Sequence, residues 1–270
     1  MTMPYGVDIS RYQYSSDGSV KMDFDKLILH ANKPKYIGIR AGVSWGYVDA
    51  WFSRSFSEAG RVGLYRMPYH VIYFGESAQA QVDNFFRIAG NADWNHDRPV
   101  LDLEVAGSNT KSRITATTIQ VMEIIKQRIG YYPINYSRKG WIDQYLSVND
   151  MPECDWWLAS YLTSLAYPAF TPEMQPPPYM PIGVNQWVFH QTGSKGDGIS
   201  HGAASHYIDQ NRFNGTDGDL ARYFGYSESP LPSLEERVTI LETNAVQTEK
   251  RLKALEAAMH THLNMPIIGK

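Results

Sequence analysis

Short apolar segments of strand character recur along the chain, and segments with helical periodicity separate them through its first half. Between Val100 and Val105 apolar and polar residues alternate, as in a half-buried strand. Residues 115–129 instead place apolar side chains, among them Val121 and Ile125, on one stripe of a helix. The predicted strands are Tyr5–Ile9, Tyr36–Arg40, Leu64–Tyr73, Val100–Val105, Ile134–Tyr136, Trp156–Tyr161, Gly183–Phe189 and Tyr207–Phe213, and the predicted helices cover about 23–32, 50–61, 77–89, 115–129 and 138–146.

The alternation of strands with helices indicates βαβ units and a parallel sheet. Between Tyr161 and Tyr226 no further helix is predicted, and the segment 171–181 carries five prolines, too many for a helix interior. Eight strands with about five helices predict an α/β fold, an irregular (β/α)5β3 TIM-like barrel over residues 1–226. The proline-rich segment is interpreted as an insertion that reshapes one wall of a groove.

Beyond Tyr226 the pattern changes. Residues 227–232 form a Ser/Pro linker, and Ser233 to Glu236 matches a capping box at the start of a helix. Apolar positions then follow at alternating spacings of four and three residues. This heptad pattern predicts a coiled-coil helix over 233–264 that joins two or three copies of the chain. A single amphipathic helix docked on the barrel is the alternative.

Four carboxylates fall at or near strand ends. Asp102 and Glu104 project to the same side of one strand, roughly 6–7 Å apart along the backbone. Asp8 ends the first predicted strand and Asp209 lies in the eighth. Because reactive groups of such barrels gather at the carboxyl ends of the strands, we expect these four acids at one mouth. Two close acids, one of them protonated, are the minimum for glycoside hydrolysis, and a salt-bridged strand end is the structural alternative.

The composition excludes several classes of protein. A net charge of -3 and a pI near 6.2 give no electrostatic footprint for nucleic acid, and a mean hydropathy of -0.38 argues against a membrane protein. Cys154 is the only cysteine, which excludes an intramolecular disulfide. No signal peptide is expected at the start of the chain. The histidines lack the spacing of a zinc site, so neither a metal nor another cofactor is predicted. The 7 Trp and 18 Tyr suit a groove that stacks on sugar rings.

A series of short motifs between residues 4 and 225 resembles the glycoside hydrolase family 25 muramidases. The resemblance begins with an opening D-I-S-x-x-Q pattern at Asp8 to Gln13. The chain departs from that family after Arg40, where Ala-Gly-Val-Ser-Trp replaces a small polar-acidic turn. The further matching motifs are Ile39–Ala41, Tyr47–Asp49, Ala59–Gly60 with Gly63, Tyr69–His70, Leu101–Glu104, Trp157–Tyr161 and Ile208–Phe213.

The resemblance implies a role for each matched residue. Glu104 corresponds to the general acid and Asp102 to its partner carboxylate, with Asp8 and Asp209 as the two further acids of the site. On the seventh strand two registers are possible, so that Trp187 or Gln191 contacts sugar. The implied substrate-binding residues are Tyr69, Tyr136, Arg40, Trp157 and Trp187.

The resemblance also implies the reaction, which is cleavage of the β-1,4 bond between N-acetylmuramic acid and N-acetylglucosamine in peptidoglycan. Asp102 either assists attack by the substrate's own N-acetyl group, our first choice, or attacks the anomeric carbon itself, and both routes retain configuration. A chitin-type glycan hydrolase and a non-catalytic wall-binding or tail protein are the alternatives. The expected setting is bacteriophage lysis, from the host cytoplasm or from a virion tail.

Overall fold

The computed structural model describes residues 3–161 and 176–227. The chain divides into two units, residues 1–230 and 231–270, and every described residue belongs to the first. The predicted coiled coil over 233–264, the predicted linker after Ser227 and residues 171–175 of the proline-rich segment lie outside the described residues.

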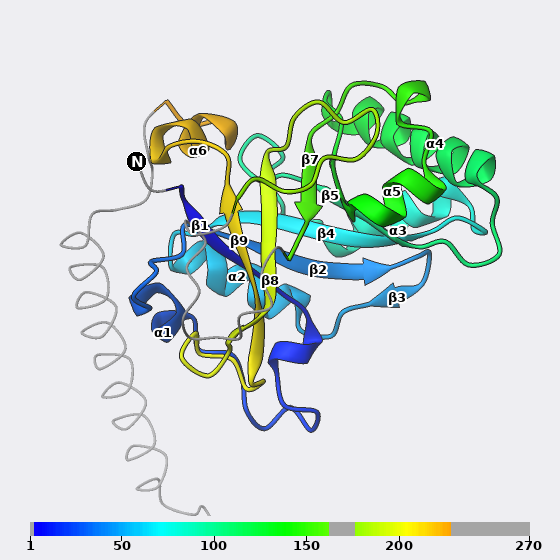
Figure 1. Cartoon of the computed structure of the whole chain (residues 1–270). Coiled ribbons are helices and arrows are strands. Elements are labelled where there is room, and N and C mark those ends of the chain that lie inside the picture. The colour runs from blue at the N-terminus through cyan, green and yellow to red at the C-terminus, as the bar shows by residue number, and fades with distance from the viewer. Residues whose placement is uncertain (1–2, 162–175, 228–270) are drawn as a thin grey trace, which may run out of the picture. The chain divides into compact units, whose positions relative to one another are not determined.

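The described residues form one sheet that closes into a barrel (Figure 1). Its strands are β1 (Tyr5–Ile9), β2 (Tyr36–Val43), β3 (Tyr47–Val48), β4 (Tyr65–Tyr73), β5 (Val100–Val105), β6 (Ile134–Arg138), β7 (Trp156–Ala159), β8 (Phe189–Asp197) and β9 (Tyr207–Phe213). Strand β1 pairs with β2 on one side and with β9 on the other, which closes the ring. Pairing is parallel from β1 through β2, β4, β5, β6 and β7 to β8, whereas β9 runs antiparallel to both neighbours. Since β3 only extends β2 as a hairpin, eight strands form the ring, which confirms the predicted α/β barrel.

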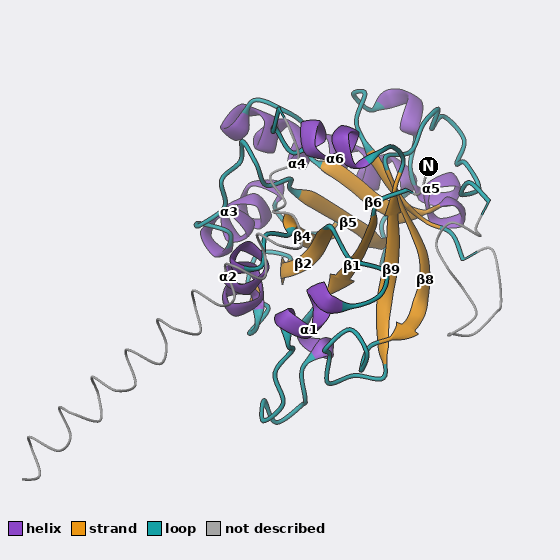
Figure 2. Cartoon of the chain, turned by 90° about the vertical axis from the view of Figure 1, so that its left-hand side faces the viewer, coloured by secondary structure: helices purple, strands orange, loops and turns teal. Residues whose placement is uncertain are grey.

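The five helices predicted between residues 23 and 146 are all present. The helices are α1 (Phe24–Leu29), α2 (Phe52–Arg61), α3 (Ala78–Ile88), α4 (Lys111–Ile129), α5 (Lys139–Tyr145) and α6 (Asp217–Tyr223), with short 3-10 helices at Arg11–Gln13 and Val148–Asp150. Helix α2 packs on β2 and β4, and α3 packs on β2 and α4, along the outer side of the barrel (Figure 2). No helix in the described part of the chain is long and apolar enough to cross a membrane.

Helix α4 shows how local sequence sets these elements. The Thr110 side chain accepts a hydrogen bond from the Arg113 backbone N–H and so caps the first turn. Gly130, with a φ of 89°, ends the helix in the left-handed conformation that glycine adopts without strain. Val121 and Ile125 of the predicted stripe are fully buried, because this face lies against the barrel.

Two predictions for the last third are wrong. Helix α6 follows β9, although no helix was expected in the barrel after Tyr161. A capping box formed by Thr216 and Asp219 satisfies the backbone N–H groups of its first turn and so stabilises this short helix. The strand expected at Gly183–Phe189 instead begins at Phe189 and runs through the glycine-rich segment. Those glycines permit close pairing with β9, since a Cβ on Gly196 would lie 2.7 Å from the Gln210 side chain.

The barrel interior is filled below its open end by large aromatic side chains. Trp157 on β7 and Tyr36 on β2 are buried, and Tyr36 meets Phe189 edge to face at 5.0 Å. Gly38 makes room for this layer, because a Cβ there would lie 2.7 Å from the Trp157 ring and 2.8 Å from the Asp8 Cβ. Strand side chains alternate between the inside and the outside of the barrel. Inward-facing residues two positions after this aromatic layer therefore lie at the open end of the barrel.

Candidate active site

A cavity of about 220 Å³ opens at the carboxyl ends of the barrel strands and contains all four predicted acids. Asp8 and Asp209 are paired positions on β1 and β9, and Asp102 lies on β5 beside Tyr136 of β6. The register of the closed sheet therefore brings together residues from opposite ends of the sequence. The cavity is lined by Asp8, Ser10, Tyr12, Arg40, Tyr69, Val100, Asp102, Glu104, Tyr136, Trp157, Gln191 and Asp209.

Asp8 is buried and accepts hydrogen bonds from two amides. The Asn211 Nδ2 donates to Asp8 Oδ2 at 2.8 Å, and the Gln191 Nε2 donates to the same oxygen at 2.9 Å. Burial raises the pKa of Asp8, whereas these donors and a bond to the Asp209 carboxyl lower it. Burial and the neighbouring Asp8 charge raise the pKa of Asp209 well above its ordinary value. Because two carboxyl groups share a hydrogen bond only when one of them carries a proton, Asp8 and Asp209 hold a proton in common.

Asp102 and Glu104 occupy the same face of β5 but differ in burial. Asp102 Oδ1 is buried and has no hydrogen-bond partner among the described residues. Burial, together with the charges of Glu104 and Asp8, raises the pKa of Asp102 well above its ordinary value. Burial also raises the pKa of Glu104, although the Arg138 charge opposes it, and the residue stands at the exposed end of the strand. The cluster therefore binds protons at pH values where isolated carboxyls are ionised.

Two amide side chains hold Asp8, of which Gln191 was considered from the sequence only as a sugar contact and Asn211 was given no role. The Gln191 Oε1 accepts hydrogen bonds from the Tyr136 and Tyr161 hydroxyls, each at 2.7 Å. The Asn211 Oδ1 accepts one from Trp157 Nε1 at 2.8 Å. Since both amide oxygens are engaged in this way, both amide nitrogens face Asp8. Asn211 could have been found by alternation, because it lies two residues after Asp209 on the same strand.

The predicted substrate-binding residues divide into two groups. Tyr69, Tyr136, Arg40 and Trp157 line the cavity. Trp187 does not line the cavity. Two registers were left open for the seventh strand, and the observed one places Gln191 in the cavity. The reason is that β8 begins only at Phe189; Trp187 precedes it, with its ring beneath the Arg212 guanidinium at 5.5 Å.

Arg40 has two roles in the structure. Its Nε donates to Asp49 Oδ2 at 2.9 Å, in an ion pair whose carboxylate is almost fully buried. The remaining part of the guanidinium lines the cavity and lowers the pKa of Asp102. Arg40 is thus a structural ion pair and a source of positive charge at the mouth.

The described residues contain no group of three or more His, Cys, Asp or Glu arranged to hold a metal ion. Burial lowers the pKa of His70, His190 and His201 to about 4, so these rings are neutral near pH 7. The His190 Nε2 bonds the Ser160 carbonyl at 2.7 Å, which is a structural contact.

Residues 7–198 match the model of glycosyl hydrolases family 25. The chain belongs to this family. The uncharacterized protein YegX of Escherichia coli O6:H1 is 28% identical over 237 residues, covering 84% of this chain and 75% of that protein. A bacterial lysozyme from Streptomyces coelicolor superposes with a TM-score of 0.67 at 22% identity, covering 84% of this chain and 99% of the other. The catalytic domain of endolysin ply40 from bacteriophage P40 of Listeria monocytogenes gives 0.61 at 17% identity, covering 83% and 98%.

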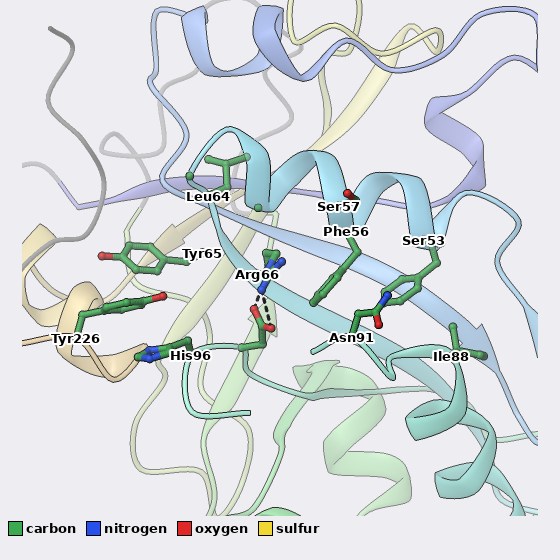
Figure 3. A pocket seen from close by; sticks show the side chains of 14 residues that line it. Ser53, Phe56, Ser57, Leu64, Tyr65, Arg66, Ile88, Asn91, His96 and Tyr226 are labelled. Carbon is green, nitrogen blue, oxygen red and sulfur yellow. Dashed lines mark hydrogen bonds and ion pairs between the residues drawn. The ribbon is translucent and has the colours of Figure 1, made fainter. Parts of the chain in front are cut away.

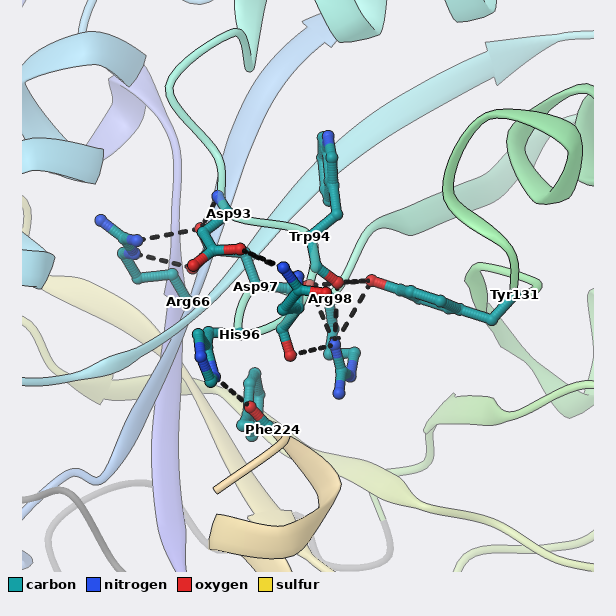
Figure 4. A network of polar contacts seen from close by, with 9 residues as sticks. Arg66, Asp93, Trp94, His96, Asp97, Arg98, Tyr131 and Phe224 are labelled. Carbon is teal, nitrogen blue, oxygen red and sulfur yellow. Dashed lines mark hydrogen bonds and ion pairs between the residues drawn. The ribbon is translucent and has the colours of Figure 1, made fainter. Parts of the chain in front are cut away.

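This family 25 barrel has a second cavity, of about 580 Å³, at the amino end of β4 and beside α2 (Figure 3). Its acid, Asp97, receives two hydrogen bonds from Arg66, at 2.8 and 2.9 Å, and a third from the Asp93 backbone N–H (Figure 4). The same loop bonds α6, where Arg98 Nε donates to the Tyr223 carbonyl at 2.9 Å. Because the Asp97 carboxylate accepts three hydrogen bonds, it fixes this loop against β4 and is not a free acid.

Proposed function

We propose that the protein is an N-acetylmuramidase that hydrolyses the β-1,4 bond between N-acetylmuramic acid and N-acetylglucosamine in peptidoglycan. The observation that carries the proposal is the acid pair of β5, in which half-buried Asp102, whose buried Oδ1 has no hydrogen-bond partner among the described residues, lies two residues from a more exposed Glu104. Membership of family 25 supports this reaction class.

Glu104 is the proposed general acid. Its raised pKa keeps a proton available for the leaving glycosidic oxygen, and its place at the open end of β5 lets a polymer approach. The resulting carboxylate then removes a proton from the water that completes hydrolysis. Asp8, whose ionised form is favoured by two amide donors, supplies negative charge near the developing oxocarbenium ion.

Asp102 is proposed to assist the substrate's N-acetyl group. In this route the acetamido oxygen attacks the anomeric carbon as the bond to the leaving oxygen breaks, and ionised Asp102 accepts the acetamido N–H. The buried Oδ1 without a partner among the described residues supports such a role, because a substrate N–H would satisfy it. Direct attack by Asp102 is the competing route, and both retain configuration.

A fluorinated sugar substrate separates these two routes. Substrate assistance predicts no covalent adduct by mass spectrometry, whereas an adduct mapped to Asp102 would establish direct attack. Analysis of the first-formed product by NMR should show retention, and inversion would refute both routes.

The reaction is tested by loss of turbidity of purified cell walls, measured beside chitin. We expect wild-type protein to clear the walls and Glu104→Gln to leave them intact. Activity on chitin alone would support the chitin-type alternative, and binding to walls without turnover by the wild type would support a wall-binding or tail protein.

The proposed setting is lysis of the bacterial wall by a phage product, either an endolysin or a tail enzyme. The heptad pattern over 233–264 is the basis for proposing a dimer or trimer. Light scattering of the whole chain and of a variant ending at Ser227 tests this. The whole chain should have an oligomeric mass and the shortened chain a monomeric one, and a monomeric whole chain would refute the coiled coil.

A further inference from the structure

A second cleft adjoins the acidic cavity and is larger, at about 670 Å³. Tyr12 and Arg40 line both, so the two spaces lie side by side. The cleft is built by the segments that follow β1, β2 and β4, at the carboxyl end of the barrel where the four acids lie. It is lined by Arg11, Tyr12, Arg40, Val43, Ser44, Trp45, Gly46, Tyr47, Tyr73 and Glu76.

The hairpin between β2 and β3 forms the outer wall of the cleft, and buried polar groups fix its shape. The Ser44 carbonyl accepts hydrogen bonds from His70 Nε2 at 2.7 Å and Asn84 Nδ2 at 3.0 Å. Gly42 lets the two strands approach, since a Cβ there would lie 2.3 Å from the Tyr47 carbonyl oxygen. Trp45, 60% exposed, is therefore presented on a fixed turn. This turn is where the sequence departs from the family pattern.

The centre of the cleft is a cluster of two arginines and two tyrosines. The Arg11 guanidinium lies 5.0 Å from the centre of the Tyr12 ring and 5.8 Å from that of Tyr47, and Arg40 lies 5.2 and 5.9 Å from the same rings. Because the guanidinium groups stack on the tyrosines, those ring faces are less open to a sugar. The cluster therefore presents cations beside aromatic surface.

The two arginines differ in their acidic partners. Arg40 is paired with Asp49, whereas Arg11 makes no ion pair within the described residues, and its guanidinium lies over the rings of Tyr12 and Tyr47. A capping box at Ser10 fixes the short helix that carries Arg11. The position of a cation without an acidic partner beside an exposed indole suits a ligand that carries both a carboxylate and apolar groups.

We propose that this cleft binds the acidic peptide stem of the muramyl unit whose glycosidic bond lies in the acidic cavity. The stem's carboxylate meets Arg11, and its methyl groups lie against Trp45. The inference rests on the proposed muramidase function and adds a source of specificity to it, because chitin carries no such peptide. Because Tyr12 and Arg40 line both spaces, the cleft lies next to the acidic cavity and beside a group attached to the bound sugar.

Arg11→Gln tests the charge, with three substrates compared: glycan strands that bear peptide stems, the same strands stripped by an amidase, and chitin oligosaccharides. We expect KM for stem-bearing strands to rise about fivefold, the order of one partly exposed charge-assisted contact, with kcat unchanged. KM for the other two should stay within about twofold. Arg54→Gln is the matched control, since it removes the same charge from an exposed position on α2 that lines neither cavity.

Binding to the inactive Glu104→Gln protein separates this inference from the proposed reaction. Stem-bearing strands should bind about fivefold more weakly when Arg11→Gln or Trp45→Ala is added, and melting temperatures should not change because both side chains are exposed. Unchanged binding would overturn the inference even if the wild type cleaves walls. An equal loss on stripped strands would also overturn it, by assigning the contact to the lactyl carboxylate. Failure of the wild type to cleave any strand would refute the reaction, while weaker binding by the variants would still support the cleft.

Discussion

Gln191 is the residue whose replacement tests the site most directly. Its amide donates to Asp8 and accepts from the hydroxyls of Tyr136 and Tyr161, while only 3% of the residue is exposed. Gln191→Met keeps the length of the side chain and removes all three hydrogen bonds. The lost hydrogen bond to the Asp8 carboxylate contributes about 2 kcal/mol to stability, and leaving the Tyr136 hydroxyl without a partner costs about 1 kcal/mol. Tyr161 is half exposed and can bond water instead. The free energy of unfolding should therefore fall by about 3 kcal/mol.

The same substitution has a predictable effect on the pH profile. The Gln191 donor favours ionised Asp8, so its loss raises the pKa of Asp8 further. Since the proposed mechanism uses the Asp8 charge, the acid limb of kcat/KM should move to higher pH. Gln191→Glu provides the comparison: it retains an acceptor for both tyrosines, donates to Asp8 only when protonated, and should lose activity as pH rises. Urea unfolding and kcat/KM against pH measure both effects. An unaltered stability and acid limb in Gln191→Met would refute the assignment of this amide as a positioning residue.

Four further outcomes follow from the site and the barrel. Glu104→Gln should lower the lytic rate by roughly 10²-fold or more with an unchanged melting temperature, and near-normal lysis would refute the general-acid assignment. The profile of kcat/KM against pH should be bell-shaped with both limbs above ordinary carboxyl values, since burial raises the pKa of Asp102 and of Glu104; an acid limb near pH 4 would contradict this. Asp102→Asn should abolish lysis yet stabilise the fold at pH 8. Burial raises the pKa of Asp102 in the folded protein above its value in the unfolded chain. The fold is therefore most stable below the unfolded-state pKa, where Asp102 is protonated, and it loses that stability as pH rises through the folded-state pKa. The gain in melting temperature of Asp102→Asn over wild type should accordingly vanish at pH 3. Asp97→Asn should cost about 3 kcal/mol in urea unfolding with kcat unchanged, because it breaks a buried pair far from the acids, and a loss of kcat would show that the two ends are coupled.

The sequence was sufficient for the acids because two simple rules govern them. Alternation along β5 puts Asp102 and Glu104 on one side, and strand ends of a parallel barrel converge. Asp8 and Asp209 follow from the same rules once the strands are recognised. Helices α2, α3 and α4 were equally accessible, because each has a buried stripe long enough to show its period.

What the sequence did not predict depends on register and on short-range geometry. The position of Trp187 was wrong because the start of β8 was placed six residues too early, a shift that also hid the glycine-rich half of the strand. Helix α6 has only two buried residues, Leu220 and Ala221, and so shows no stripe, although its capping box was readable. The amide of Gln191 and the cation of Arg11 have no pattern of their own. Their importance comes from which groups the fold places beside them.

The two ends of the barrel use buried charge in opposite ways. At the amino end the Asp97 carboxylate accepts three hydrogen bonds and is balanced by Arg66, so its buried charge is compensated and closes the loop onto α6. At the carboxyl end, the four acids face two amide donors and the charges of Arg40 and Arg138, and Asp102 Oδ1 has no hydrogen-bond partner among the described residues. Such a deficit destabilises the fold unless a ligand supplies donors, and an acetamido N–H is a donor of the required kind. The ion pair at the amino end can thus stabilise a barrel whose carboxyl end lacks hydrogen-bond donors. Because the acids at the carboxyl end lack donors, they are suited to bind and protonate an N-acetylated sugar.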